Sequence, residues 1–229
     1  MDELVQFLHD RDAVVVGFAD LADLPADVRG GMPVGVSFAV SLVPSIAAAI
    51  PDGPSQDYSD EYDSKNAHLS RVAEEAAEFL RERGHSAVPL ASTGVGVNPE
   101  TLSTALPHKT VATKAGLGWV GKCALLITEG YGAAIRFCTV LTDADLPVAE
   151  PVTESRCGQC NECMKVCPGG AVKGPNWYAG IPRDEIFDAF ACRDAQVRRR
   201  TAAGVKKTGC GLCIVACPYT KRYLSMMGY

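Results

Sequence analysis

The chain has 229 residues, of which 47% are hydrophobic and 21% charged, an ordinary balance for a soluble globular protein with one large or two small domains. No apolar run is long enough to cross a bilayer, and the first residues, MDELVQFLHDRD, are acidic where a secretory leader would be basic. These features argue against a membrane protein and predict a cytoplasmic location.

Charge divides the chain into two regions. Residues 1–150 carry ten Lys and Arg against twenty-one Asp and Glu, a net charge of −11, whereas residues 151–229 carry twelve against six, a net charge of +6. The stretch DADLPVAEPVTES, at 143–155, contains two prolines and reads as a linker. The sequence therefore predicts two domains, residues 1–148 and 149–229.

The first region begins with short strands and a long helix. Strands are predicted at 13–18, 34–42 and 87–92, the second from the strict alternation in VGVSFAVSL. A helix is predicted at 66–83, ending before Gly84. Its apolar stripe consists of Leu69, Val72, Ala73, Ala76, Phe79 and Leu80.

The rest of the first region mixes one more helix with two strands. The helix is expected at about 103–114, and residues 123–128 and 133–142 are expected to form a hairpin around Gly130–Gly132. The predicted fold class is α+β, a mixed α/β arrangement with a partly antiparallel sheet.

A glycine-rich stretch, AGLGWVGKC at 115–123, satisfies two nucleotide-binding patterns at once, G-x-x-x-x-G-K and G-x-G-x-x-G. Both patterns require a strand before the glycines and a helix after them. Here a predicted helix precedes the glycines and a predicted strand follows. The order of elements therefore argues against nucleotide binding.

The cysteines indicate iron–sulfur chemistry. The run CGQCNECMKVCP has the C-x2-C-x2-C-x3-C-P spacing of bacterial two-cluster ferredoxins, and CGLCIVACP repeats its last three cysteines fifty residues later. The missing first member of the repeat falls on Lys207, and Cys192 can fill the vacancy. In that ferredoxin pattern the fourth cysteine ligates the other cluster. The predicted sets are Cys157, Cys160, Cys163 and Cys217 for one 4Fe-4S cluster, and Cys167, Cys192, Cys210 and Cys213 for the other.

Structural zinc is the alternative, because C-x2-C pairs also bind zinc. All four histidines (His9, His68, His85 and His108) lie in the first region, and a doubled C-x3-C-P is not typical of zinc sites. Iron is therefore favoured. Cys138, on an apolar strand, is expected in the core.

The stretch HKTVATKAGLGWVGKCALLI, then YGAAIRFCTVLTD, then the eight-cysteine tail resembles the epoxyqueuosine reductase family and, more distantly, reductive dehalogenases. The resemblance implies a nitroreductase-like corrinoid-binding domain followed by a two-cluster ferredoxin-like domain, with electrons passing through both clusters to cobalamin. None of the four histidines has the D-x-H-x-x-G setting of a protein ligand to cobalamin, so a base-off cofactor is expected. It implies that the corrinoid lies beside Gly116, Gly118, Trp119, Gly121 and Lys122. A tight turn with Trp119 in the core is the alternative for this loop.

The chain departs from that family at two points. Leu102 stands where the family has its proposed acid, so His108 is the candidate catalytic proton donor. The chain also resembles a short form without the C-terminal helical-repeat domain that family members use for transfer RNA. Together with the acidic first region, this predicts a small-molecule substrate, and transfer RNA is not expected as a partner.

The predicted function is that of a cytosolic iron–sulfur oxidoreductase, an enzyme that reduces an unidentified small substrate. Two alternatives stay open: an electron-transfer protein or corrinoid-reducing activator without its own substrate, and a flavin-dependent reductase with FMN in place of cobalamin. The basic run RRRTAAGVKK, at 198–207, predicts an acidic ferredoxin or flavodoxin as the electron donor, unless it is only a solvated loop.

Overall fold

The computed structural model describes residues 2–92, 96–206 and 209–229. The chain divides into two compact units that interleave along the sequence. The first comprises Met1–Ser41, Lys65–Leu117 and Arg136–Val152, and the second comprises Leu42–Ser64, Gly118–Ile135 and Thr153–Tyr229. The predicted domains were consecutive, with a boundary after residue 148, and that division stays a prediction.

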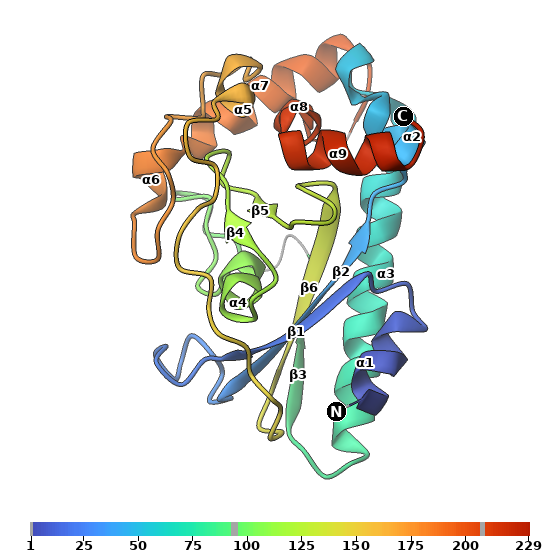
Figure 1. Cartoon of the computed structure of the whole chain (residues 1–229), viewed down its shortest axis with the longest axis vertical. Helices are drawn as coiled ribbons and strands as arrows, with labels where there is room; N and C mark the ends of the chain where they lie inside the picture. The colour runs from blue at the N-terminus through green and yellow to red at the C-terminus, as the bar shows by residue number, and fades with distance from the viewer. Residues whose placement is uncertain (1, 93–95, 207–208) are drawn as a thin grey trace. The chain divides into compact units, whose positions relative to one another are not determined.

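An antiparallel-rich sheet forms the centre of the first unit. Its strand order is β1-β2-β6-β3, made of β1 (Val15–Asp20), β2 (Val34–Ser41), β6 (Ile135–Thr142) and β3 (Ala87–Leu90) (Figure 1). β1 pairs antiparallel with β2, and β3 pairs antiparallel with β6. The alternation of β2 sends Val36, Phe38 and Val40 into the larger core, so the three strands predicted earliest in the chain are confirmed within about two residues.

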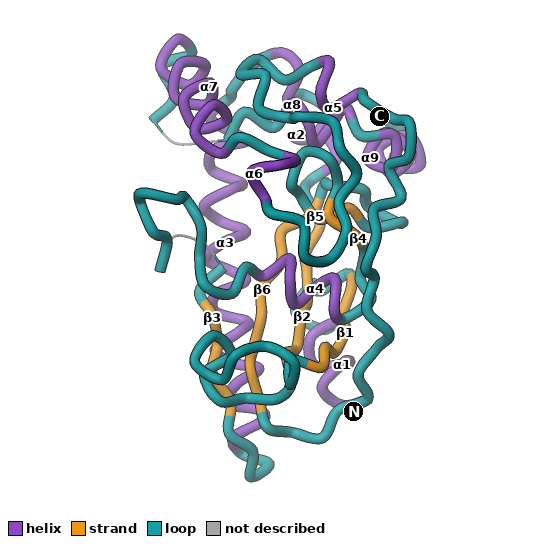
Figure 2. Tube along the Cα trace, turned by 90° about the vertical axis from the view of Figure 1, so that its left-hand side faces the viewer, coloured by secondary structure: helices purple, strands orange, loops and turns teal. Residues whose placement is uncertain are grey.

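Helices cover both faces of this sheet. α1 (Asp2–His9) and α3 (Gln56–Arg81) lie on one face and α4 (His108–Lys114) on the other (Figure 2). The predicted stripe of α3 is confirmed, since all six of its members belong to or border the larger core cluster. On the opposite face, Val111 and Ala115 pack with Ala19, Leu21 and Leu141. The fold is therefore the mixed α/β arrangement that the sequence predicted.

Two helix boundaries differ from the prediction. α3 begins ten residues early, because Ser55 Oγ accepts a hydrogen bond of 3.2 Å from the Tyr58 amide and starts the helix. Residues 56–65 are mostly polar and carry no apolar stripe. α4 begins only at His108, since Pro107 is extended, with φ −66° and ψ 135°.

Among the described helices, none combines the length and the apolar character needed to cross a membrane.

The predicted hairpin between residues 123–128 and 133–142 is wrong. β5 (Leu126–Ile127) pairs instead with β4 (Trp119–Val120) in a separate two-stranded ribbon, while β6 joins the sheet. Only an isolated bridge between Thr128 and Gly132 remains of the expected pairing. The ribbon belongs to the second unit.

Short helices make up most of the second unit. They are α2 (Pro44–Ala48), the 3-10 helix η1 (Ile50–Asp52), α5 (Glu162–Lys165), α6 (Arg183–Ile186), α7 (Ala189–Ala202), α8 (Leu212–Ala216) and α9 (Pro218–Met226). Their core contains Leu42, Ile50, Tyr58, Ala134, Tyr223 and Leu224. Tyr223 of α9 donates a hydrogen bond of 3.3 Å to the Leu42 carbonyl and so anchors the last helix within this core.

Gly118 is the position where the ribbon tolerates no side chain. A Cβ there would lie 2.1 Å from the Ile127 carbonyl oxygen, which is backbone and cannot move aside cheaply. We expect Gly118→Ala to lower the free energy of unfolding by about 1–3 kcal/mol, measured by anaerobic chemical denaturation. Gly130→Ala is the matched control, because nothing lies within 4 Å of its Cβ position. Equal stability of the two variants would contradict the prediction.

Candidate metal centre

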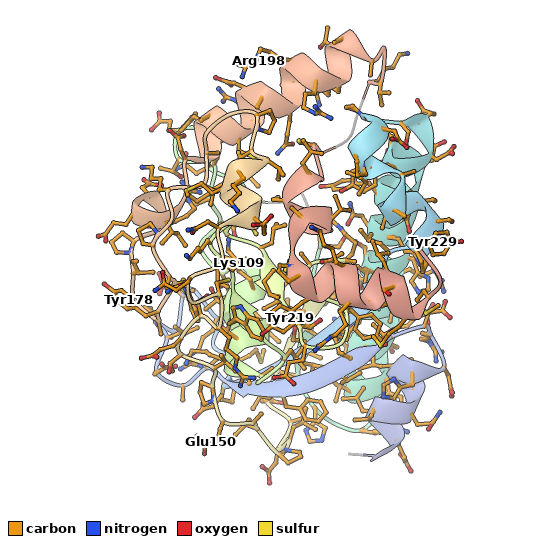
Figure 3. All side chains as sticks on the ribbon, turned by 45° about the horizontal axis from the view of Figure 1, so that its top comes forward. Lys109, Glu150, Tyr178, Arg198, Tyr219 and Tyr229 are labelled. Atoms are coloured by element: carbon orange, nitrogen blue, oxygen red, sulfur yellow. The ribbon has the colours of Figure 1, made fainter. Side chains whose placement is uncertain are left out.

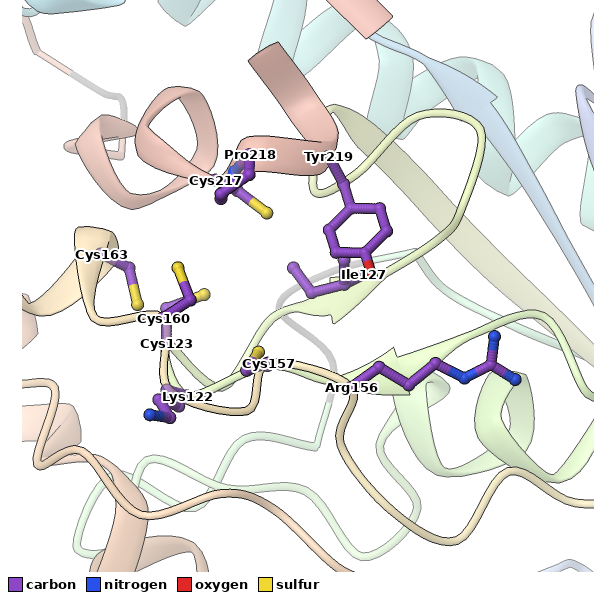
Figure 4. A pocket seen from close by; sticks show the side chains of 11 residues that line it. Lys122, Cys123, Ile127, Arg156, Cys157, Cys160, Cys163, Cys217, Pro218 and Tyr219 are labelled. Carbon is purple, nitrogen blue, oxygen red and sulfur yellow. The ribbon is translucent and has the colours of Figure 1, made fainter. Parts of the chain in front are cut away.

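Four of the predicted ligands meet at one cavity in the second unit. Cys157, Cys160, Cys163 and Cys217 line a space of about 50 Å³, together with Cys123 and Tyr219. Figure 4 shows sulfur atoms of these cysteines directed into that space. Cys157 and Cys160 come from the loop that leads into α5, Cys163 lies in α5 itself, and Cys217 comes from the junction of α8 and α9.

The Cys-Pro dipeptide explains how Cys217 reaches the cavity. Pro218 occupies the first position of α9, where its missing N–H costs nothing. A residue before proline avoids the helical region, and Cys217 is extended, with φ −63° and ψ 127°. Cys217 therefore ends α8 and starts α9, and its side chain projects from the break between them.

Three members of the second predicted set, Cys192, Cys167 and Cys210, interact at the start of α7. Asp188 caps this helix by accepting a hydrogen bond of 2.9 Å from the Ala191 amide, which fixes Cys192 in the first turn. Cys192 interacts with Cys167 and Cys210, and burial raises the pKa of its thiol. Cys213 follows Cys210 and lies at the start of α8. Lys207 occupies the position in the repeat for which Cys192 is the predicted substitute, and it lies outside the described residues.

The donor chemistry fits iron–sulfur clusters. Each iron of a 4Fe-4S cluster binds one cysteine thiolate. A cavity lined by several cysteines can therefore hold such a cluster. Lys122 supports this fit, because its residue is only 4% exposed and its Nζ donates a hydrogen bond of 2.9 Å to the neutral amide oxygen of Asn161. A buried ammonium normally has an anionic partner, which a thiolate-bound cluster would provide. Among the described residues, no three His, Cys, Asp or Glu side chains lie close enough together to hold a single metal ion.

The glycine-rich loop is explained by packing of the chain on itself. Gly116, in the first unit, has a φ of +70°, and its Cβ position lies 3.2 Å from Ala149 Cβ. Gly118 and Gly121, in the second unit, pack against Ile127, the latter with its Cβ position 2.8 Å from Ile127 Cγ1. Their side-chain space is occupied by protein, so the packing of the chain already accounts for glycine at these positions. As corrinoid contacts they stay predictions.

Trp119 is a core residue of the second unit. It is fully buried and makes an edge contact with Tyr219, with ring centroids 5.0 Å apart, while the Arg156 guanidinium lies 5.4 Å from its ring centroid. Arg156 also forms an ion pair with Glu129. This arrangement corresponds to the alternative of a tight turn with Trp119 in the core.

His108, the predicted proton donor, is held by both ring nitrogens within the first unit. Nε2–H donates a hydrogen bond of 2.9 Å to the Ala91 carbonyl, so Nδ1 accepts from the Thr139 hydroxyl, also at 2.9 Å. Burial lowers the pKa of His108, the Ala91 bond acts against this, and the charge of Arg136 lowers it further. The neutral imidazole is therefore favoured, and its catalytic role stays a prediction.

These features define a two-cluster iron–sulfur protein. Residues 156–220 match the family described as a 4Fe-4S double cluster binding domain, which contains all eight predicted ligands. This match supports the 4Fe-4S assignment over structural zinc. The division of the eight cysteines into two crossed sets stays a prediction.

The resemblance to epoxyqueuosine reductases is confirmed. The chain is 34% identical over 121 residues to the epoxyqueuosine reductase of Synechococcus sp. (strain RCC307), covering 53% of this chain and 37% of that protein. It is 32% identical over 120 residues to that of Escherichia coli (strain K12), covering 52% of this chain and 31% of that protein. The chain thus spans about a third of the length of these curated relatives.

Solved structures share the fold. An epoxyqueuosine reductase in complex with an epoxyqueuosine-modified tRNA-Tyr stem loop has a TM-score of 0.63 at 18% identity, covering 96% of this chain and 65% of that one. A reductive dehalogenase, whose structure suggested a mechanism for B12-dependent dehalogenation, has a TM-score of 0.66 at 16% identity, covering 98% and 33%. The flavin alternative receives no support from these matches.

The expectation that transfer RNA is not a partner is contradicted. The relatives are epoxyqueuosine reductases, and one structural neighbour holds a tRNA stem loop. The expectation rested in part on the net charge of residues 1–150, but phosphate recognition depends on where basic side chains gather locally. On α7, Arg193 and Arg198 are exposed (Figure 3 labels Arg198), in a chain whose total charge is negative.

Cys123 is a residue of the cluster cavity that the sequence patterns did not indicate. Cys123 is 4% exposed and lines the cavity with the four predicted ligands. The sequence did contain one signal for its location. Eight of the ten cysteines are predicted cluster ligands, so a further cysteine next to Lys122 could have been expected near a cluster. Cys138 lies in the core of the first unit, as expected, and burial raises the pKa of its thiol to about 12.

The lowered pKa of His108 predicts a pH dependence of stability. The unfolded chain binds a proton near pH 6.5 while the folded chain resists it, so this contribution to stability is present above that pH and is lost as the pH falls. We expect wild-type protein to lose stability on acidification more steeply than His108→Gln, by up to about 1.4 kcal/mol for each pH unit. Unfolding curves between about pH 7 and pH 5 test this. Parallel profiles would contradict it.

Cys192 is expected to be a cluster ligand. Anaerobically reconstituted wild-type protein should hold about eight irons per chain, and Cys192→Ala should hold about four, because one cubane loses a thiolate. Iron and sulfide analysis measures this. Cys138→Ala is the control, since it also removes a buried thiol but lies in the first unit. A Cys192→Ala protein with the full iron content would exclude Cys192 as a ligand.

Proposed function

We propose that this chain is the reductase core of an iron–sulfur enzyme that uses a corrinoid and reduces an epoxide carried on a tRNA stem loop. The observation that carries the proposal is the gathering of Cys157, Cys160, Cys163 and Cys217 at one cavity, with Cys192 beside Cys167 and Cys210. The names of the curated relatives and the tRNA stem loop bound by a structural neighbour support the substrate class.

Two clusters suit the electron count of this reaction. Each 4Fe-4S cluster exchanges one electron at a time, so the pair can supply two electrons. Reduction of an epoxide to an alkene consumes two electrons and two protons, breaks both C–O bonds, forms the carbon–carbon double bond and releases water. The eight cysteines hold the electron-transfer centres, and the buried Lys122 balances negative charge beside one of them.

The corrinoid enters the proposal through the fold shared with a reductive dehalogenase for which a B12-dependent mechanism was suggested. When bound, a corrinoid supplies a reducible cobalt centre. The five loop residues named from the resemblance do not carry this part of the proposal, because the chain itself fills the space beside their glycines.

A binding experiment tests the cofactor. Anaerobically reconstituted protein is mixed with cobalamin or with FMN and passed over a gel-filtration column. We expect cobalamin to stay with the protein at micromolar concentration, which corresponds to binding of about −8 kcal/mol or tighter. Retention of FMN alone would support the flavin alternative. Retention of neither would favour an electron-transfer protein.

A single-turnover experiment tests the substrate. The cobalamin-loaded protein is reduced chemically and mixed with an epoxyqueuosine-modified tRNA stem loop, and the nucleosides are analysed by mass spectrometry. We expect loss of one oxygen atom from the modified base. Cys163→Ala, which lacks one predicted ligand of the cavity, is the control and should leave the epoxide intact. Unchanged substrate with fully loaded wild-type protein would contradict the epoxide proposal.

A further inference from the structure

Cys123 is a ninth cysteine at the cluster cavity, beyond the eight that two cubanes require. Each cubane has four irons and takes one thiolate on each, so the eight predicted ligands leave Cys123 without an iron to bind. Yet it is buried and lines the same cavity as Cys157, Cys160, Cys163 and Cys217 (Figure 4). Its sulfur therefore has a role other than ligation.

The turn between β4 and β5 holds Cys123 in this place. The Ala124 amide donates a hydrogen bond of 2.8 Å to the Gly121 carbonyl, and the Gly121 amide donates one of 2.8 Å to the Leu125 carbonyl. Ala124 adopts the left-handed region, with a φ of +60°. Because this backbone is closed by hydrogen bonds on both sides, Cys123 is carried to the cavity by a rigid turn.

The thiol of Cys123 interacts with Cys163 and with Cys213. Cys163 is a predicted ligand of the first cluster, and Cys213 is a predicted ligand of the second. Cys123 therefore lines the cavity of the first set and also interacts with the second set, which places it at the junction of the two.

A neutral thiol at this position can donate a hydrogen bond. A cysteine that binds no metal carries its proton at neutral pH, as an ordinary cysteine does. The S–H group is a weak donor, and a metal-bound thiolate is a good acceptor. Hydrogen bonds to cluster sulfurs are among the factors that set the reduction potential, because they stabilise the more negative, reduced cluster.

We propose that Cys123 donates an S–H hydrogen bond to a ligand sulfur at the junction of the two clusters and raises the reduction potential of the cluster that accepts it. Cys123 is thus a positioning residue for electron transfer, and it does not bind iron. This inference rests on the cluster part of the proposed function and is independent of the corrinoid and of the substrate.

Redox titration of the reconstituted protein, monitored by electron paramagnetic resonance, tests this proposal. We expect Cys123→Ala to keep about eight irons and to show a more negative midpoint potential for at least one cluster. Cys123→Ser, which keeps a donor of similar size, should recover part or all of the shift. Cys138→Ala, a buried thiol of the first unit, should leave both potentials unchanged.

Two results would overturn the inference. Unchanged potentials in Cys123→Ala, with the full iron content, would show that its thiol does not act on the clusters. Loss of about four irons in both Cys123→Ala and Cys123→Ser would make Cys123 a ligand instead. If wild-type protein takes up no iron, the cluster assignment itself is refuted. That outcome can be told apart from the two results above, in which wild-type protein holds its clusters.

Discussion

A cubane requires four thiolates around one volume, and this requirement shapes the second unit. Cys217 meets Cys157, Cys160 and Cys163 at one cavity, although they lie far from it in the sequence, and short helices with many breaks achieve this. α9, which follows Cys217, is anchored by Thr220, whose hydroxyl accepts a hydrogen bond of 2.9 Å from the Ala133 amide. Since a Cβ on Gly132 would lie 2.2 Å from the Thr220 amide nitrogen, α9 and this loop approach as closely as backbones can.

The glycine-rich loop also brings side chains to the cluster cavity, and it does so through a tight turn. Its glycines let a two-stranded ribbon close tightly on Ile127, and the turn at the end of the ribbon carries Lys122 and Cys123 to the cavity. One of these supplies a buried positive charge and the other a buried thiol. Residues that resemble a nucleotide-binding motif in the sequence thus contribute to the surroundings of a metal centre, where charge and hydrogen bonding tune redox behaviour.

Several polar side chains of the first unit are paired within it, although Ser37 Oγ and Asn66 Nδ2 are buried without a hydrogen-bond partner among the described residues. His108 uses both ring nitrogens on the Ala91 carbonyl and the Thr139 hydroxyl, and Arg136 donates to the side chain of Asn66 at 2.7 Å. Buried polar groups must be paired in this way, because an unpaired one costs free energy comparable to a lost hydrogen bond. The hydrogen bonds of His108 and Arg136 therefore stabilise the packing of the sheet and its helices.

The sequence by itself determined what local patterns encode. Cysteine spacing indicated the clusters because closely spaced thiols on one loop reach adjacent corners, and apolar periodicity predicted β1, β2 and the buried stripe of α3. Only the tertiary structure decided the partners of short segments: β5 pairs with β4 and not with β6, and Cys123 lines the same cavity as Cys163. The physical reason is that the pairing of two-residue strands and the meeting of distant side chains depend on non-local packing, which leaves no periodic signal in the chain.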